Sequence, residues 1–180
     1  MLPKFLFIAC GGTIGGEWDP SQDTVVPTKH ANKRLFDYLK ESVKLYRPPK
    51  FVDLFNKDSR AISDKDRGLI VKTILDHRAR GYRHILITHG TFTMAKTGAY
   101  IAKGLAKKKI ADVCVVITGS MIPNTGFAPS DAQFNMGFAM GRLSALGPRD
   151  ESGVYVCMNG HLLPPDHIEK NVKKARFEKR

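Results

Sequence analysis

The sequence predicts an α/β fold in which helices cover a doubly wound, mostly parallel, Rossmann-like sheet. Apolar runs of strand length alternate along the chain with segments of helical period, which is the pattern of successive βαβ units. The 180 residues are 42% hydrophobic and 26% charged, values that are ordinary for a packed globular protein, and this length suits a single domain over residues 1–180. Glycine-rich turns follow two of the predicted strands, which is where sheets of this class bind their ligands.

The N-terminal part of the chain is expected to form a strand, a turn and a helix. Phe5–Cys10 is an apolar strand that passes directly into a glycine-rich turn at residues 11–16. A short strand or hairpin arm is predicted at Thr24–Val26. A helix is predicted over Ala31–Val43, since the apolar residues of this segment share one face: Leu35, Phe36, Leu39 and Val43.

The next predicted elements are a strand at Phe51–Phe55 and a helix that ends near Arg80. Ser63 and Asp66 have the spacing of a capping box, in which each side chain accepts a hydrogen bond from the other residue's backbone N–H. The helix therefore starts after Ser63, and Gly81 is suited to end it.

The second half continues the alternation of strands and helices. Strands are predicted at three apolar segments: His84–Thr88, Val113–Thr118 and Gly153–Met158. One helix is predicted over Asp131–Leu146, and another follows the first of these strands, with small or apolar residues spaced four, three and four apart: Met94, Gly98, Ile101 and Leu105. Beyond Pro164 and Pro165, which oppose helix formation, the chain is expected to end in a polar, basic tail.

Charge and hydropathy bear on the possible partners. The net charge is +12, with basic residues concentrated at 103–109 and 170–180, which suits either a polyanion such as nucleic acid or a solvated surface. No aromatic-rich RNA-binding sequence is interleaved with these residues, so nucleic acid is the less favoured partner. No apolar run approaches the roughly 20 residues of a membrane-spanning helix, and the N-terminal run lacks the cleavage region of a signal peptide.

The cysteines indicate a compartment. Cys10, Cys114 and Cys157 cannot all pair, each lies in an apolar run, and none has the spacing of a metal ligand. We therefore expect reduced thiols in the core, a cytoplasmic protein and no metal site.

Two of the predicted strands end in the same way, with glycine followed by threonine. The first runs into Gly12 and Thr13, and the second into Gly90 and Thr91. Because the carboxyl ends of parallel strands meet at one edge of a sheet, both hydroxyls are expected to face one crevice, at the point where the strand order reverses. Glycine allows tight turning and close approach to a ligand, although taken singly such a turn needs no function.

In combination these segments resemble the L-asparaginase/glutaminase family of bacterial type. The resemblance covers nearly the whole chain and rests on Gly11-Gly12-Thr13-Ile14, His89-Gly90-Thr91-Phe92-Thr93-Met94, Thr118-Gly119-Ser120-Met121-Ile122-Pro123 and Ser130-Asp131-Ala132-Gln133-Phe134-Asn135. It implies the fold of the family's N-terminal domain and an amidohydrolase in which a threonine attacks a carboxamide and ammonia is released. It implies no metal or organic cofactor.

The resemblance also implies roles for individual residues. Thr13 corresponds to the nucleophile, while Thr91 and Lys170 correspond to a relay that moves protons, with Lys170 as a lysine whose pKa is lowered by desolvation. N–H groups near Gly12 and Thr91 would hold the oxyanion. Four further residues are expected to bind substrate, with Ser59 holding a carboxylate: Ser59, Arg60, Gly90 and Phe92. For Lys170 and Ser59, a plain tail lysine and a plain turn serine are the alternatives.

The sequence departs from the family pattern around the substrate. Phe92 stands where the family has an aspartate that binds the substrate's α-ammonium, and Arg60 stands where the family has a neutral residue. An apolar ring cannot replace that ion pair, so we expect an amide without a free α-ammonium and a site not optimised for free L-asparagine.

Two other family features are missing. No tyrosine lies between Ile14 and Asp37 to activate the nucleophile, and the loop contains Glu17, Trp18 and Asp23 instead. The family's smaller C-terminal domain, which contributes an acid to a neighbouring subunit's site, has no counterpart here, so a homo-oligomer is a hypothesis. These departures leave two alternatives to the hydrolase: a non-catalytic ligand-binding module, or the amidase component of an RNA-dependent amidotransferase.

Overall fold

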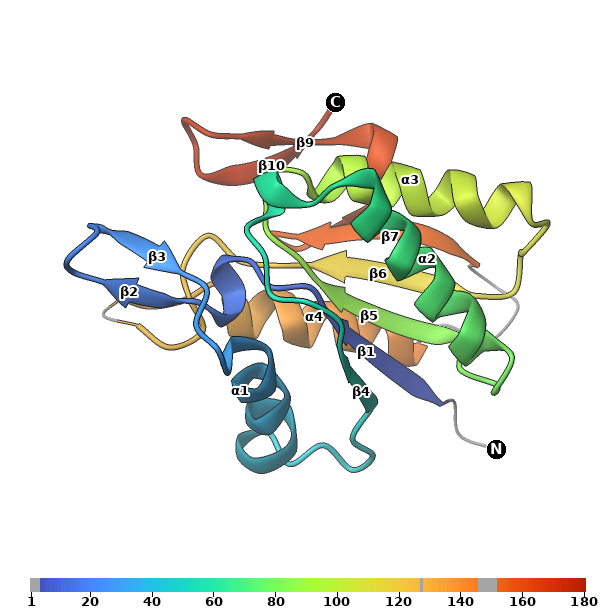
Figure 1. Ribbon diagram of the computed structural model, residues 1–180, viewed down its shortest axis with the longest axis horizontal. Coiled ribbons are helices and arrows are strands. Elements are labelled where there is room, and N and C mark those ends of the chain that lie inside the picture. Colours follow the sequence, from blue (N-terminus) through green and yellow to red (C-terminus); the bar gives the residue numbers. More distant parts are fainter. Residues whose placement is uncertain (1–3, 127, 146–151) are drawn as a thin grey trace.

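A computed structural model describes residues 4–126, 128–145 and 152–180 (Figure 1). Its main feature is a six-stranded sheet with the order β4-β1-β5-β6-β7-β8, in which only β8 runs antiparallel to its neighbour. The strands are β1 (Phe5–Ala9), β4 (Lys50–Asp53), β5 (His84–Thr88), β6 (Cys114–Thr118), β7 (Gly153–Met158) and β8 (His161–Leu163). The predicted doubly wound, mostly parallel sheet is therefore confirmed.

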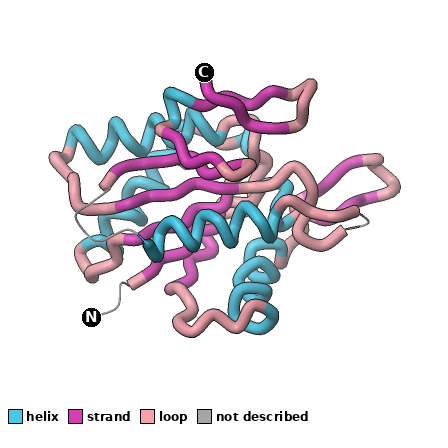
Figure 2. The backbone as a smooth tube through the Cα atoms, turned by 180° about the vertical axis from the view of Figure 1, so that it is seen from behind, coloured by secondary structure: helices cyan, strands magenta, loops and turns pink. Residues whose placement is uncertain are grey.

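Helices cover both faces of this sheet. The four α-helices are α1 (Ala31–Asp37), α2 (Asp64–Arg78), α3 (Met94–Lys107) and α4 (Ala132–Ala145). Apolar residues of α2 and α3 pack on one face, and those of α1 and α4 on the other. Figure 2, seen from behind, shows α4 lying across the sheet on this second face.

The helix boundaries follow from local residues. Ser63 and Asp66 form the predicted capping box, and Gly81, with a φ of 87°, follows the end of α2. The predicted helix at 31–43 is shorter than expected, because α1 passes at Tyr38 into a π-helical turn, η2 (Tyr38–Ser42). The helix at 131–146 is confirmed as far as Ala145, and Leu146 lies outside the described residues.

The order of the strands places the two threonine-bearing turns next to each other. The chain leaves β1 for β4 on one side, and the next strand, β5, pairs with β1 on the other. β1 and β5 thus flank the point at which the strand order reverses, where α/β sheets bind ligands outside the carboxyl ends of their strands.

The C-terminal segment is not the polar tail that the sequence suggested. It folds into a short 3-10 turn, η4 (Pro165–His167), and a hairpin of β9 (Ile168–Asn171) with β10 (Arg176–Lys179). Ile168 and Phe177 are almost completely buried in the same core as α2 and α3, which anchors the hairpin beside α3 (Figure 1). The alternation of apolar and charged residues that is typical of strands is hard to recognise in this part of the sequence, because so many of its residues are basic.

A second hairpin projects from the N-terminal part of the chain. Its strands are β2 (Glu17–Asp19) and β3 (Thr24–Val26), which pair in antiparallel register (Figure 1). Two further 3-10 turns are η1 (Thr13–Gly15) and η3 (Ser59–Ala61). In the described ranges no helix is long and apolar enough to span a bilayer.

Candidate active site

A cavity of about 260 Å³ opens beyond the carboxyl ends of β1 and β5. Seven of the eight predicted site residues line it, and they come from three separate turns: Gly12, Thr13, Ser59, Arg60, Gly90, Thr91 and Phe92. The remaining wall comes from the hairpin of β2 and β3, from Asp58 and from the turn after β6: Trp18, Asp23, Thr24, Val25, Asp58 and Met121. The structure therefore brings the predicted residues together in one place.

Close backbone contacts hold the three turns against one another. Gly12 has a φ of 90°, and a Cβ added to it would lie 2.4 Å from the Gly90 nitrogen. A Cβ on Gly90 would in turn lie 2.8 Å from the Ser59 side chain. Only glycine allows the turns to approach this closely, so the spacing of the site depends on these two positions.

The eighth predicted residue, Lys170, reaches the site from β9. Its Nζ lies 2.7 Å from Thr91 Oγ1, to which it donates a hydrogen bond, and Thr91 itself is buried. Burial and the positive charge of Arg60 lower the pKa of Lys170, while Asp58 opposes this shift. The fold of the C-terminal hairpin thus directs this amine at a threonine hydroxyl.

Thr13 has a different environment. Its side chain is half-buried at the cavity, and within the described ranges its hydroxyl makes no hydrogen bond. The N–H of Gly12 donates to the Lys57 carbonyl at 3.2 Å, so Gly12 itself is not available as an oxyanion donor. The N–H groups of Thr13 and Thr91 have no such partner in the described chain and remain as candidates.

The Phe92 side chain forms the centre of a stack of charged groups. The Lys170 Nζ lies 3.8 Å from the ring centroid, and the Arg60 Cζ lies 4.8 Å from it. Arg60 is held in turn by Asp58, with Nε and Nη2 donating to the two carboxylate oxygens at 3.0 and 2.8 Å. This contact with Arg60 lowers the pKa of Asp58, which therefore stays ionised.

Ser59 lies both in a turn and in the wall of the cavity. It begins the turn η3, for which the Asp58 side chain provides the cap, and its carbonyl accepts a hydrogen bond from Thr93 Oγ1 at 2.7 Å. Its side chain also lines the cavity, where it packs against Gly90.

Of Glu17 and Asp23, the two carboxylates considered for the loop, only Asp23 lines the cavity. Asp23 does so from the turn of the β2–β3 hairpin, whereas Glu17 forms an ion pair with Arg34 at 2.7 Å. Thr24, Val25 and Met121 were missed from the sequence. Their residue types give no chemical signal, and only the folded hairpin and the turn after β6 bring them to the cavity.

The buried His89 interacts with the backbone. Its Nδ1 lies 2.8 Å from the Gly90 carbonyl oxygen. Complete burial lowers its pKa to about 4, so the imidazole is neutral near pH 7. Asp131 and Asn135 likewise brace the turn after β6, where the carboxylate accepts hydrogen bonds from the N–H groups of Met121 and Ile122.

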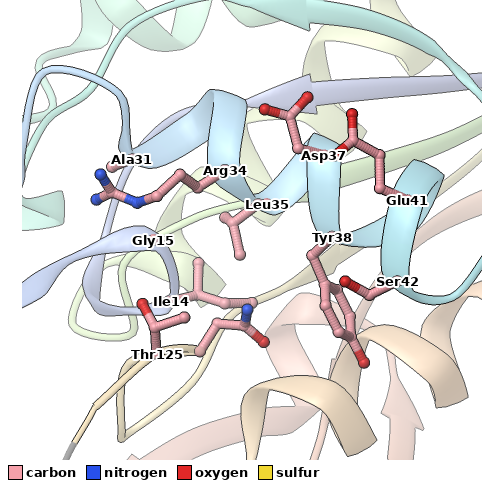
Figure 3. Close-up of a pocket in the computed structure, with 11 residues that line it drawn as sticks. Ile14, Gly15, Ala31, Arg34, Leu35, Asp37, Tyr38, Glu41, Ser42 and Thr125 are labelled. Carbon is pink, nitrogen blue, oxygen red and sulfur yellow. The ribbon is translucent and has the colours of Figure 1, made fainter.

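A second cavity, of about 250 Å³, lies between α1 and the turn after β1. None of the predicted substrate-binding or catalytic residues lines it, although Ile14 and Gly15, which follow Thr13, do. Figure 3 shows Ile14 and Leu35 pointing toward each other, whereas the carboxylates of Asp37 and Glu41 point away from them. Among the residues that the structure describes, no group of three or more His, Cys, Asp or Glu side chains is arranged to hold a metal ion.

Comparison with solved structures finds the same fold in three L-asparaginases. Each is matched over 98% of this chain: the probable cytoplasmic L-asparaginase of Campylobacter jejuni (TM-score 0.77, 22% identity), L-asparaginase I of Vibrio cholerae (0.72, 25%) and the thermostable L-asparaginase of Thermococcus kodakarensis (0.70, 23%). The chain spans only about half of their length, namely 53%, 51% and 51%. No curated protein sequence gave a significant match.

The sequence itself matches one family model. The model of the asparaginase N-terminal domain aligns with residues 4–177, which is nearly the whole chain. This chain therefore belongs to the asparaginase family and corresponds to its N-terminal domain.

Proposed function

We propose that this protein is an asparaginase-like amidohydrolase that uses Thr13 to release ammonia from a small carboxamide. One observation carries the proposal: the Lys170 amine lies 2.7 Å from the Thr91 hydroxyl, at the same cavity that Thr13 lines. Membership of the asparaginase family and the folds of the three L-asparaginases support it.

The first half of the proposed reaction forms an ester. The neutral Lys170 amine takes a proton from Thr91, which takes one from Thr13, and Thr13 Oγ1 attacks the amide carbon. The bond from carbon to Thr13 forms and the carbon–nitrogen bond breaks, while the proton returns through Thr91 to the departing nitrogen, which leaves as ammonia. The N–H groups of Thr13 and Thr91 are the donors proposed for the oxyanion.

The second half regenerates the threonine. A water molecule gives its proton to the same relay and attacks the ester carbon, which releases the carboxylic acid and returns the proton to Thr13 Oγ1. The lowered pKa of Lys170 supports this assignment, because it increases the fraction of neutral amine near neutral pH. Positioned hydroxyls, an amine and backbone dipoles suffice for each step.

The test is an ammonia-release assay over amino-acid amides, N-acylated amides and deaminated amides. Release from at least one amide by the natural protein, and none by a folded Thr13→Ala variant, is the expected result. Binding of an amide without any turnover would favour the non-catalytic binding module instead. Turnover that survives in Thr13→Ala would contradict the nucleophile.

Partners and compartment belong to the same proposal. We expect a homo-oligomer, which light scattering at micromolar concentration tests, and a cytoplasmic location, which three buried free cysteines favour. Nucleic acid is the weaker expectation, since half of the basic residues of the C-terminal hairpin contact Glu178 or Glu169 themselves: Lys174, Arg176 and Arg180. Absence of tRNA binding near 50 mM salt, where phosphate contacts are strongest, would exclude the RNA-dependent alternative.

A further inference from the structure

We infer that the substrate of this site is the monoamide of a dicarboxylic acid that carries no α-ammonium, and that Phe92 and Arg60 select it. The inference rests on the proposed function and names its substrate class. The geometry that points to it is the stack of Lys170, Phe92 and Arg60, of which Phe92 and Arg60 line the cavity.

The first step concerns the ring itself. Phe92 is 54% exposed, so the core does not require it, yet its ring centroid lies 3.8 Å from the Lys170 Nζ and 4.8 Å from the Arg60 Cζ. The fixed positive charge of Arg60 already lies against the π-system of this ring. The α-ammonium of an amino acid would therefore gain little attraction there and would lie next to a like charge on Arg60.

The second step concerns the carboxylates that could balance such an ammonium. Asp58 is the one beside the stack, but both of its oxygens accept hydrogen bonds from Arg60. Asp23 also lines the cavity, from the turn of the β2–β3 hairpin. Asp58, the carboxylate that lines the cavity beside Phe92, is therefore already engaged by Arg60 and not free to balance an α-ammonium.

The third step concerns what this end does offer. Arg60 uses Nε and Nη2 on Asp58, so Nη1 is free of hydrogen bonds within the described residues and can donate to an anion. The guanidinium stays charged at every working pH, and contact with Asp58 fixes its orientation. The Ser59 hydroxyl lies in the same wall. These groups suit a carboxylate at the far end of the substrate, with the amide directed at the threonines.

Three amides of matched length separate the possibilities. Succinamate carries a carboxylate and no ammonium, L-asparagine carries both, and butyramide carries neither. We expect kcat/KM for succinamate to exceed that for L-asparagine on the order of 100-fold, because like charges placed together cost several kcal/mol. Butyramide is expected to have a raised KM with little change in kcat, since it lacks only the contact with Arg60.

Variants at the two positions identify the cause. Phe92→Asp should shift the ratio of kcat/KM toward L-asparagine on the order of 100-fold, because it adds a carboxylate beside the substrate. Phe92→Leu is the matched control, since it also removes the ring but adds no charge, and it should leave L-asparagine disfavoured. Arg60→Gln should raise KM for succinamate and leave KM for butyramide unchanged.

The outcomes distinguish the inference from the proposed function. If the natural protein hydrolyses L-asparagine as fast as succinamate, or butyramide as fast as succinamate, the inference is overturned while the hydrolase stands. If folded protein releases ammonia from none of the three, nor from the wider amide panel, then the hydrolase itself is wrong and the inference falls with it. Circular dichroism of each variant establishes that it is folded.

Discussion

Two turns with almost the same residues face the cavity, one after β1 and the other after β5, and their surroundings differ. Thr91, after β5, is buried and accepts a hydrogen bond from Lys170, a residue 79 positions further along the chain. Thr13, after β1, is half-buried and its hydroxyl has no hydrogen-bond partner in the described chain. Gly12 has a positive φ, whereas Gly90 does not.

The difference suggests a division of labour between two chemically equal side chains. A hydroxyl that contacts a lysine can pass protons, and a hydroxyl without such a partner can reach a substrate carbon. Both turns have glycine followed by threonine, so these residue types do not set the two roles. The roles differ because the C-terminal hairpin brings Lys170 to Thr91, whereas the Thr13 hydroxyl has no such partner in the described chain. The predictions below test this comparison, beginning with the largest expected effect.

The largest effect is expected at Thr13. Thr13→Ala should reduce ammonia release on the order of 10⁴-fold or more, because a missing nucleophile is not compensated by the other groups of a site. Mass spectrometry of acid-quenched reactions should find an acyl group on Thr13 of the natural protein. Thr91→Ala should still form this ester, though slowly. An ester on Thr91 instead would mean that the roles of the two turns are reversed.

A smaller effect is expected at the lysine that distinguishes the second turn. Lys170→Met should lower kcat by about 10²- to 10⁴-fold, the usual contribution of a general base. In the natural protein, the rate should rise with pH as the Lys170 amine becomes neutral, with a midpoint below the ordinary lysine pKa of 10.5, because burial and Arg60 lower the pKa. The Lys170→Met variant should lack this rise.

Lys173→Met provides the matched control, because Lys173 is an exposed lysine on the same hairpin and makes no hydrogen bond or ion pair in the described chain. It should leave both kcat and the pH profile unchanged. An equal loss in both variants would indicate an effect of surface charge and would contradict the relay.

The two glycines offer a comparison by stability. Gly12→Ala should lower the free energy of unfolding by about 2–5 kcal/mol, since it adds both backbone strain and a clash with the Gly90 backbone. Gly90→Ala should cost less, about 1–3 kcal/mol, because its φ is unstrained and its closest contacts would be with the Ser59 side chain at 2.8 Å, the Ser59 backbone nitrogen lying further off at 3.1 Å.

Urea denaturation measures these differences. Gly141→Ala, on α4, is the control, because its Cβ would meet nothing within 4 Å and helical alanine is favoured by about 0.5–1 kcal/mol. If Gly12→Ala and Gly90→Ala left the free energy of unfolding as little changed as Gly141→Ala does, the close packing of the two turns would not require glycine at these positions.

The sequence predicted most of the sheet and the glycine-threonine turns, because apolar periodicity and glycine both act locally. It predicted the position of Lys170 only through the family resemblance. The hairpin that holds this residue was missed, because basic side chains hide the pattern in which Ile168 and Phe177 enter the core. The contacts of Arg60 and Lys170 with Phe92 join segments far apart in the chain, so no local pattern could have indicated them.

The smallest effect is the pH dependence of stability that arises from His89. This histidine lies in the turn after β5, and the turn after β1 has no histidine. Its pKa is lowered by burial from 6.5 to about 4, so between these values the unfolded chain binds a proton that the folded protein does not. The free energy of unfolding should therefore rise with pH across this range, and His89 alone should make it about 1–3 kcal/mol lower at pH 4.5 than at pH 7.

Urea denaturation at several pH values measures this slope of the free energy of unfolding against pH. The slope should be flatter in His89→Gln, which cannot be protonated, and unchanged in His161→Gln, where the histidine is exposed. The strongly paired carboxylates of Asp66 and Glu178 do not account for this slope, because their pKa values are lowered to about 2 and their contributions are lost only in more acidic solution. A slope equal to that of the natural protein in His89→Gln would mean that the imidazole is hydrated or paired, and that the turn after β5 is more open than its burial indicates.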